Sequence, residues 1–220
     1  MRPFVFVVGL LSFVFLTISS IILLISLSPR LYVHGFEKYD VYATLSLSKE
    51  DVNREGLDVV SYLKGGISQL DAEFFSQQAL VHMEDVRGLF AAVRWLFYLS
   101  LVFAAVVIGY LLKVRKFDQL GGILIWSGVV LIGFVLLLGL FSLTGWEEAF
   151  TRFHKIFFRN DLWLFDPSDT LILLFPDGFF QDMFMYMATG MAVFGVVVAI
   201  SGMSLLRFWK VCVTMNKVST

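Results

Sequence analysis

The sequence predicts an α-helical membrane protein with four transmembrane helices and an extracytoplasmic cap formed by two outer loops, with one or two short β-strands in the first loop. Hydrophobic residues make up 58% of its 220 residues and charged residues only 16%, whereas apolar residues are about half of a soluble domain. Four apolar runs each reach the roughly 20 residues that a helix needs to cross a hydrocarbon core of about 30 Å. The alternating strands of a transmembrane barrel do not occur.

The four runs divide the chain into spans and loops. The expected spans are about Phe4–Leu27, Val93–Leu112, Leu120–Leu143 and Met183–Leu206. We interpret the first run as an uncleaved span and not as a secretory signal, because its apolar core is too long and no small-residue cleavage pattern follows it. The expected segments are a first helix (1–27), a first cap segment (28–92), a helical pair with a cytoplasmic turn (93–143), a second cap segment (144–182), and a last helix with its tail (183–220).

Basic residues set the predicted orientation. They gather in three short segments that contain a single acidic residue, Asp118: Arg2, then Lys113, Arg115 and Lys116, then Arg207, Lys210 and Lys217. By the positive-inside rule these segments are cytoplasmic. We therefore expect cytoplasmic N- and C-termini and two loops on the outer face.

The first outer loop has three expected elements. Short alternations such as Tyr39/Val41 predict one or two strands within 32–47. Ser48 with an acid three residues later has the pattern of a helix N-cap, and the amphipathic helix that follows should end at Gly65-Gly66. A further helix should start near Asp71 and continue into the second span.

Small residues and missing charges characterise the spans. Glycines are expected to allow close helix packing in the third and fourth spans: Gly121, Gly122, Gly128, Gly133, Gly139, Gly190 and Gly195. No span carries an internal charge, which disfavours an ion-coupled transporter. The only cysteine, Cys212, excludes a disulfide within one chain.

Three histidines lie in the outer segments: His34, His82 and His154. His34 has no patterned carboxylate nearby, so we expect a polar surface residue. His82 has Asp85 three positions later, and on a helix the two share a face, so the carboxylate can orient the imidazole. His154 is followed by polar residues that we expect to support catalysis: Asn160, Asp161, Asp166 and Asp169. Imidazole suits general acid or base catalysis near neutral pH.

Aromatic residues surround the second histidine: Trp146, Phe150, Phe153, Phe157, Phe158, Trp163, Phe165, Phe179 and Phe180. Two interpretations stay open and are compatible, an interfacial aromatic belt and the wall of a lipid-lining pocket. For the pocket, the residues expected to bind substrate are Phe153, Phe157, Phe158 and Trp163.

A metal site is the competing interpretation of the same residues. Its ligands would come from the two histidines and the nearby aspartates. No HExxH motif or comparably compact ligand spacing occurs, so we predict no metal ligand. A serine hydrolase is disfavoured because no GxSxG motif is present.

A series of short motifs extends through both outer loops: His82-Met83-Glu84-Asp85-Val86, then Phe153-His154-Lys155-Ile156-Phe157-Phe158-Arg159-Asn160-Asp161-Leu162-Trp163, then Asp166, Asp169-Thr170-Leu171-Ile172, Pro176 and Phe179-Phe180. In content, order and topology they resemble the lipoprotein intramolecular transacylases, Lit, of Gram-positive bacteria. The resemblance covers the whole chain, although residues before about Phe74 in the first loop have no confident match.

This resemblance implies an acyltransferase of the bacterial cell membrane with its active site on the outer face. The substrate would be a lipoprotein whose N-terminal cysteine carries a diacylglyceryl thioether, and its sn-2 acyl chain would move to its own α-amino group to give the lyso form. Direct attack closes a ring of roughly eight atoms, so the site must hold the two ends together. The expected partners are these lipoproteins and membrane lipid, with no cofactor and no nucleic acid.

The catalytic hypothesis assigns the two imidazoles to different steps. His154 accepts the amine proton, while His82, oriented by Asp85, protonates the leaving alkoxide or polarises the carbonyl; the reverse assignment stays open. Two other functions also stay open: a non-enzymatic sensor or accessory protein with a pH-responsive outer cap, and a metal-dependent membrane hydrolase.

Overall fold

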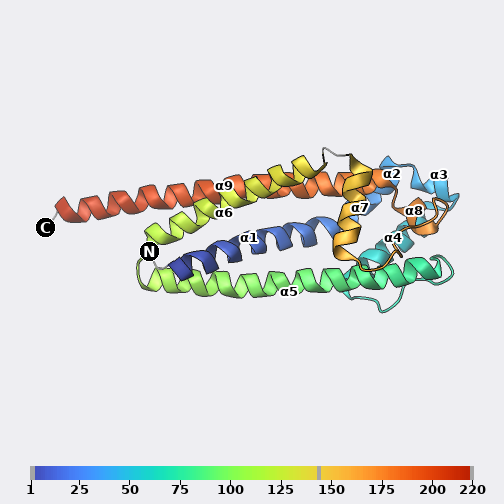
Figure 1. Ribbon diagram of the computed structural model, residues 1–220, viewed down its shortest axis with the longest axis horizontal. Coiled ribbons are helices and arrows are strands. Elements are labelled where there is room, and N and C mark those ends of the chain that lie inside the picture. The colour runs from blue at the N-terminus through green and yellow to red at the C-terminus, as the bar shows by residue number, and fades with distance from the viewer. Residues whose placement is uncertain (1–2, 143–144, 219–220) are drawn as a thin grey trace. The chain divides into compact units, whose positions relative to one another are not determined.

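The computed structural model describes residues 3–142 and 145–218, without the side chains of 141–142, 212–213 and 215–218. The side chain of Cys212 and the predicted end of the third span, Leu143, therefore lie outside what is described. Within the described ranges all regular elements are helices (Figure 1): α1 Pro3–Ser26, α2 Pro29–Lys38, α3 Val41–Leu45, α4 Lys49–Lys64, α5 Gln77–Lys113, α6 Phe117–Ser142, α7 Trp146–Phe157, α8 Thr170–Leu174 and α9 Asp177–Val218.

Four of these helices are long and apolar enough to cross a membrane: α1, α5, α6 and α9. This confirms the four predicted spans and an α-helical, multi-pass membrane protein. The helices α5 and α9 have 37 and 42 residues, well above the roughly 20 that cross a bilayer. Both begin before their predicted spans, so the same helix carries polar residues in its first turns and apolar residues later.

The chain forms two compact units, each described here by itself. The span unit comprises residues 1–21, 94–140 and 188–220, and the histidine unit comprises residues 22–93 and 141–187. Every residue predicted to act in catalysis or substrate binding belongs to the histidine unit.

Glycines bring α6 and α9 together within the span unit. A methyl group added at Gly128 would collide with the backbone of Gly195, and one added at Gly121 would lie 3.1 Å from the carbonyl oxygen of Gly202. A methyl group at Gly133 would meet nothing within 4 Å. The expected close packing therefore involves only part of the glycine set, because only glycines facing the partner helix reduce the distance between the axes.

The predicted strands in the first loop are wrong, because this stretch forms α2 and α3. Tyr32 and Phe36 lie four residues apart and are 5% and 0% exposed, which is the spacing of one buried helix face. Asp40 and Ser46 have positive φ values of 52° and 54° and flank α3. The short alternations that suggested strands thus fall partly in α3 and partly in the turns beside it, and periodicity over so few residues does not distinguish strand from helix.

The start and end of α4 agree with the sequence prediction. The Ser48 hydroxyl accepts a hydrogen bond from the Asp51 amide at 3.1 Å, and Gly65 ends the helix with a φ of 87°. A left-handed residue after a helix is most favourable as glycine, because it has no Cβ.

The start of α5 lies later than predicted. Asp71 accepts a hydrogen bond from the Glu73 amide at 2.8 Å, which forms a turn and not a first helical turn. The Ser76 hydroxyl accepts a hydrogen bond from the Ala79 amide at 3.1 Å, so it caps the helix. Asp71 and Ser76 can both cap a helix, but only Ser76 caps α5, which begins at Gln77.

The core of the histidine unit is aromatic. Tyr32 packs against Phe36, Phe175 and Phe179 with ring centroids 6.4, 5.7 and 5.2 Å away. The helix α3 contacts α2, α4 and α8. Segments from both outer loops therefore share one core, which holds the N-terminal part of α5 and the connection after α7 in place.

Candidate functional site: a buried pair of histidines

The histidine unit brings His82 and His154 together. His82 lies in the second turn of α5, and His154 lies on the buried face of α7. Their ring centroids are 6.1 Å apart, with an angle of 34° between the ring planes. The side chains are nearly inaccessible, because the residues are 6% and 7% exposed. Two imidazoles from different loops therefore face one another in a closed, apolar site.

A backbone contact fixes the orientation of the His154 ring. Its Nδ1 lies 2.8 Å from the carbonyl oxygen of Phe150, four residues earlier on α7. A carbonyl oxygen only accepts hydrogen bonds, so Nδ1 must carry the proton and donate it. In the neutral ring the basic lone pair is then on Nε2.

His82 has no such partner. Its Nδ1 is buried and makes no hydrogen bond among the described residues. A buried polar atom without a partner is costly and rare in folded proteins. It marks a position where the hydrogen-bonding atom of a bound molecule would stabilise the site.

Aromatic rings enclose the pair. Phe158 lies 5.1 Å from the His82 ring and 5.5 Å from the His154 ring. Trp163 stacks on His154 at 5.0 Å and 25°, and Phe165 contacts His82 at 5.5 Å. These three residues come from the connection between α7 and α8, so this connection forms the wall over both imidazoles.

Burial keeps both rings neutral. It lowers the pKa of His82 to about 4; the nearby His154 contributes in the same direction, and the Asp85 carboxylate opposes it. Burial also lowers the pKa of His154, partly offset by its hydrogen bond to Phe150. Because a positive charge on one ring disfavours a positive charge on the other, the two rings are not both charged near neutral pH.

Asp85 bonds to the second loop. Its carboxylate accepts a hydrogen bond from the Asn160 amide at 2.9 Å, and Asn160 in turn accepts one from the Leu162 amide at 3.1 Å. This links α5 to the connection after α7, one helical turn from His82. Asp85 acts on His82 through its charge, which raises the pKa of the imidazole.

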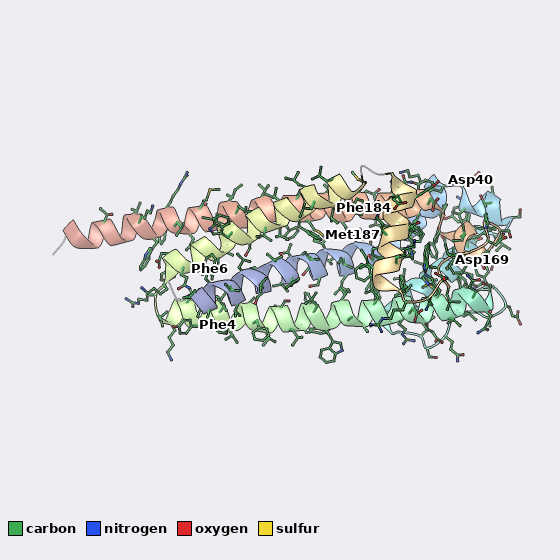
Figure 2. All side chains as sticks on the ribbon, viewed as in Figure 1. Phe4, Phe6, Asp40, Asp169, Phe184 and Met187 are labelled. Carbon is green, nitrogen blue, oxygen red and sulfur yellow. The ribbon has the colours of Figure 1, made fainter. Side chains whose placement is uncertain are left out.

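The other predicted support residues lie farther along the same connection. Asp169 caps α8 through the Leu171 amide at 2.9 Å and accepts a hydrogen bond from Ser76 at 2.6 Å (Figure 2 labels Asp169). Asp166 forms a turn with Ser168, whose hydroxyl and amide lower the pKa of its carboxyl. Asp161 is exposed. These residues shape the connection, and the structure places no direct contact between them and either imidazole.

The four predicted substrate-binding aromatics divide into two pairs. Phe158 and Trp163 are each 8% exposed and contact His154. Phe153 and Phe157 are 43% and 51% exposed, although the Phe153 ring also lies 5.3 Å from the His154 ring. His34 is exposed on α2. Among the described residues, no group of three His, Cys, Asp or Glu side chains is arranged to hold a metal ion.

The sequence prediction missed Gln78. Its Nε2 donates to the carbonyl oxygens of Leu162 and Leu164, both at 3.0 Å. The available signal was its position four residues before His82, which places both on one face of α5. Many residues have this spacing, so the sequence could not single out Gln78. Its role is visible only from its contacts with Leu162 and Leu164.

Known proteins share this fold and sequence pattern. A curated relative from Aquifex aeolicus (strain VF5), described as an uncharacterized protein, is 32% identical over 136 residues; the match covers 62% of this chain and 60% of that protein's length. The in meso structure of the membrane integral lipoprotein intramolecular transacylase Lit from Bacillus cereus has a TM-score of 0.86 at 21% identity, covering 95% of this chain and 97% of that one.

Two further structures of the Bacillus cereus protein, in which one histidine is replaced by arginine or by alanine, each have a TM-score of 0.82 at 20% identity. These structural likenesses establish the fold. The family model for lipoprotein intramolecular transacylase Lit matches residues 6–180. The chain therefore belongs to the lipoprotein intramolecular transacylase Lit family.

Proposed function

We propose that this protein is an acyltransferase that moves the sn-2 acyl chain of a diacylglyceryl-modified lipoprotein to the α-amino group of the same N-terminal cysteine. Family membership supports the reaction class. The observation that carries the proposal is the pair of buried, neutral imidazoles, 6.1 Å apart and enclosed by aromatic rings. Such a pair can take a proton from one group of a substrate and deliver a proton to another.

The reaction exchanges one ester for one amide. The amine nitrogen attacks the carbonyl carbon of the sn-2 ester and loses a proton, the carbon–oxygen ester bond breaks, and the glycerol oxygen gains a proton. No external donor or acceptor is consumed. The site must therefore provide one proton acceptor and one proton donor, and must hold amine and ester together.

His154 fits the role of base. Its Nδ1–H is committed to the Phe150 carbonyl at 2.8 Å, so the basic lone pair is on Nε2. Burial lowers its pKa and keeps the ring unprotonated near neutral pH, so it is ready to accept the amine proton. A neutral attacking amine needs such an acceptor, because the nitrogen becomes strongly acidic once it bonds to the carbonyl carbon.

His82 fits the role of donor to the leaving oxygen. Its ring faces His154, and its unpartnered Nδ1 is available to a ligand atom. Both rings start neutral, so the proton that reaches the leaving oxygen by way of His82 is the one that His154 has taken from the amine, and the pair carries a single positive charge during the exchange. The Asp85 charge stabilises the protonated form of His82 when it exists.

The aromatic enclosure supports transfer over hydrolysis. Phe158, Trp163 and Phe165 contact the imidazoles and keep them from solvent. Water attacks the same ester carbon as the amine, so its exclusion favours the amide product.

The location of the reaction is also part of the proposal. Basic residues of the three short segments predict cytoplasmic termini, which puts residues 28–92 and 144–182 on the outer face of the cell membrane. Lipoproteins anchored in the outer leaflet would then lie on the same side of the membrane as the histidine pair. Substrates and membrane lipid are the expected partners.

Mass spectrometry of a model lipoprotein tests this function. We expect His82→Asn and His154→Asn to lower N-acyl lyso-form production by about a hundredfold or more, since each removes an acid–base group. His34→Asn is the matched control and should retain the wild-type rate, because His34 is exposed on α2. Asp85→Asn keeps an acceptor for Asn160 and removes only a charge, so it should cost less than His82→Asn.

The outcomes separate the competing functions. Wild-type rates in either catalytic variant would remove that histidine from the mechanism. No conversion by the wild-type protein, together with a histidine-dependent pH response, would favour a sensor. Inhibition by chelators would favour a metal-dependent hydrolase.

A further inference from the structure

Gln78 makes an unusual pair of contacts. Its side-chain amide donates to the carbonyl oxygens of Leu162 and Leu164, at 3.0 Å each. These two residues flank Trp163 in the non-helical connection between α7 and α8. One side chain of α5 therefore holds the backbone on both sides of a single tryptophan.

The tryptophan between these carbonyls covers the proposed base. Its ring stacks on His154 at 5.0 Å and 25°, and the residue is only 8% exposed. His154 is 7% exposed, in part because of this ring. Trp163 is thus one of the rings that separate His154 from water.

A second contact joins the same connection to α5. Asn160 donates to Asp85 at 2.9 Å. Gln78 and Asp85 lie four residues before and three residues after His82, so all three share one face of α5. The connection is attached at two points, of which the Gln78 contact is nearer to Trp163 along the chain.

We infer that Gln78 is a positioning residue of the proposed transacylase: its amide holds the Leu162–Leu164 backbone so that Trp163 stays stacked on His154 and keeps water from the acyl group. This inference rests on the proposed function. Gln78 acts through Trp163 and does not take part in proton transfer.

The chemistry of the amide suits this task. Two carbonyl oxygens need two donors, and the NH2 group of glutamine supplies both from one atom. A glutamate of the same shape has no donor when ionised and repels the two carbonyl dipoles. A methionine of similar length has neither donor nor charge, so it removes the two hydrogen bonds without adding an electrostatic effect.

The experiment compares Gln78→Met and Gln78→Glu with the same changes at Gln77, which is exposed in the preceding position of α5. Wild-type protein must first convert a model lipoprotein to the lyso form; its failure to do so would sink the proposed function and not the role of Gln78. Each variant is then assayed for N-acylated product and for released fatty acid.

In the Gln78 variants we expect transfer to fall by about tenfold, because a loosened site loses the geometry of attack. The share of ester lost to hydrolysis should rise. Both Gln77 variants should match the wild type in rate and in the ratio of transfer to hydrolysis. A loss of rate with an unchanged product ratio would contradict the inference, because a merely less stable enzyme keeps its selectivity.

A second measurement does not depend on the reaction. In ¹⁵N-histidine NMR, assigned with His34→Asn and His82→Asn, we expect the pKa of His154 to rise towards its ordinary value in Gln78→Met, since burial is what lowers it. His82 is the other titratable group facing His154, and it stays in place in this variant. An unchanged His154 titration would overturn the role assigned to Gln78, whatever the rates.

Discussion

The two units satisfy their polar groups in different ways. In the span unit, the hydroxyls of Ser12, Thr17 and Ser19 donate to carbonyls four residues earlier in α1. In the histidine unit, Gln78 and Asp85 bond to residues more than seventy positions away. The first pattern is local and needs no partner helix, whereas the second exists only when both loops are folded together.

This difference teaches which substitutions should affect chemistry. In the span unit, the close approach of the helices limits which residues fit, because glycines face the partner helix. Most hydroxyls there bond only to their own helix backbone. In the histidine unit, a change at one segment disturbs a residue on another. We therefore expect effects on both stability and transfer in the histidine unit, and on stability alone at the glycine contacts.

The largest expected effect separates two neighbouring phenylalanines. Phe158→Ala should lower the free energy of unfolding by about 3 kcal/mol and reduce transfer, because it leaves a cavity against both imidazoles. Phe157→Ala should cost less than about 1 kcal/mol, since this side chain is 51% exposed. Thermal unfolding in detergent or nanodiscs measures both.

The same two variants test whether the exposed aromatic residues bind substrate. A higher KM in Phe157→Ala with an unchanged midpoint of unfolding would support contact with the lipoprotein. Equal destabilisation by the two variants would contradict the separation into buried and exposed rings.

The second prediction concerns acid. His82 has a pKa of about 4 when folded and about 6.5 when unfolded. Between these values the unfolded chain binds more protons, so stability is fully present above about pH 6.5 and is lost as the pH falls towards 4. The expected loss approaches about 3 kcal/mol, and His154 adds in the same direction.

His82→Phe tests this linkage in a site that is already aromatic. Its unfolding midpoint should fall less than that of the wild type between pH 7.5 and 4.5, whatever its loss of activity. His34→Asn serves as the control, because it removes an exposed histidine and leaves His82 in place. A wild-type acid response in His82→Phe would show that other groups cause the acid sensitivity.

The smallest expected effect compares two glycines of α6. Gly128→Ala should destabilise the protein by about 1–2 kcal/mol, because the added methyl group collides with the α9 backbone. Gly133→Ala meets nothing within 4 Å and should be neutral or slightly stabilising, since alanine favours a helix. Transfer per folded molecule should remain unchanged in both, and a selective loss of transfer in Gly128→Ala would break the distinction between the units.

Residue patterns predicted some parts of the site and not others. The spans follow from runs of apolar residues, and α4 follows from Ser48 and Gly65, because these signals act within a few positions. The strands between residues 32 and 47 were wrong, since burial of Tyr32 and Phe36 on one face favoured helix over a short alternation. The start of α5 was wrong because two capping residues competed and only tertiary packing selected Ser76.

The sequence by itself determined four apolar helices, two polar connections, and two histidines in motifs that resemble one family. Only the tertiary structure decided that the imidazoles lie 6.1 Å apart, that Asp85 bonds to Asn160, and that Gln78 holds the backbone beside Trp163. The physical reason is distance along the chain. Helix formation depends on neighbouring residues, whereas these contacts join segments that meet only when both loops share one core.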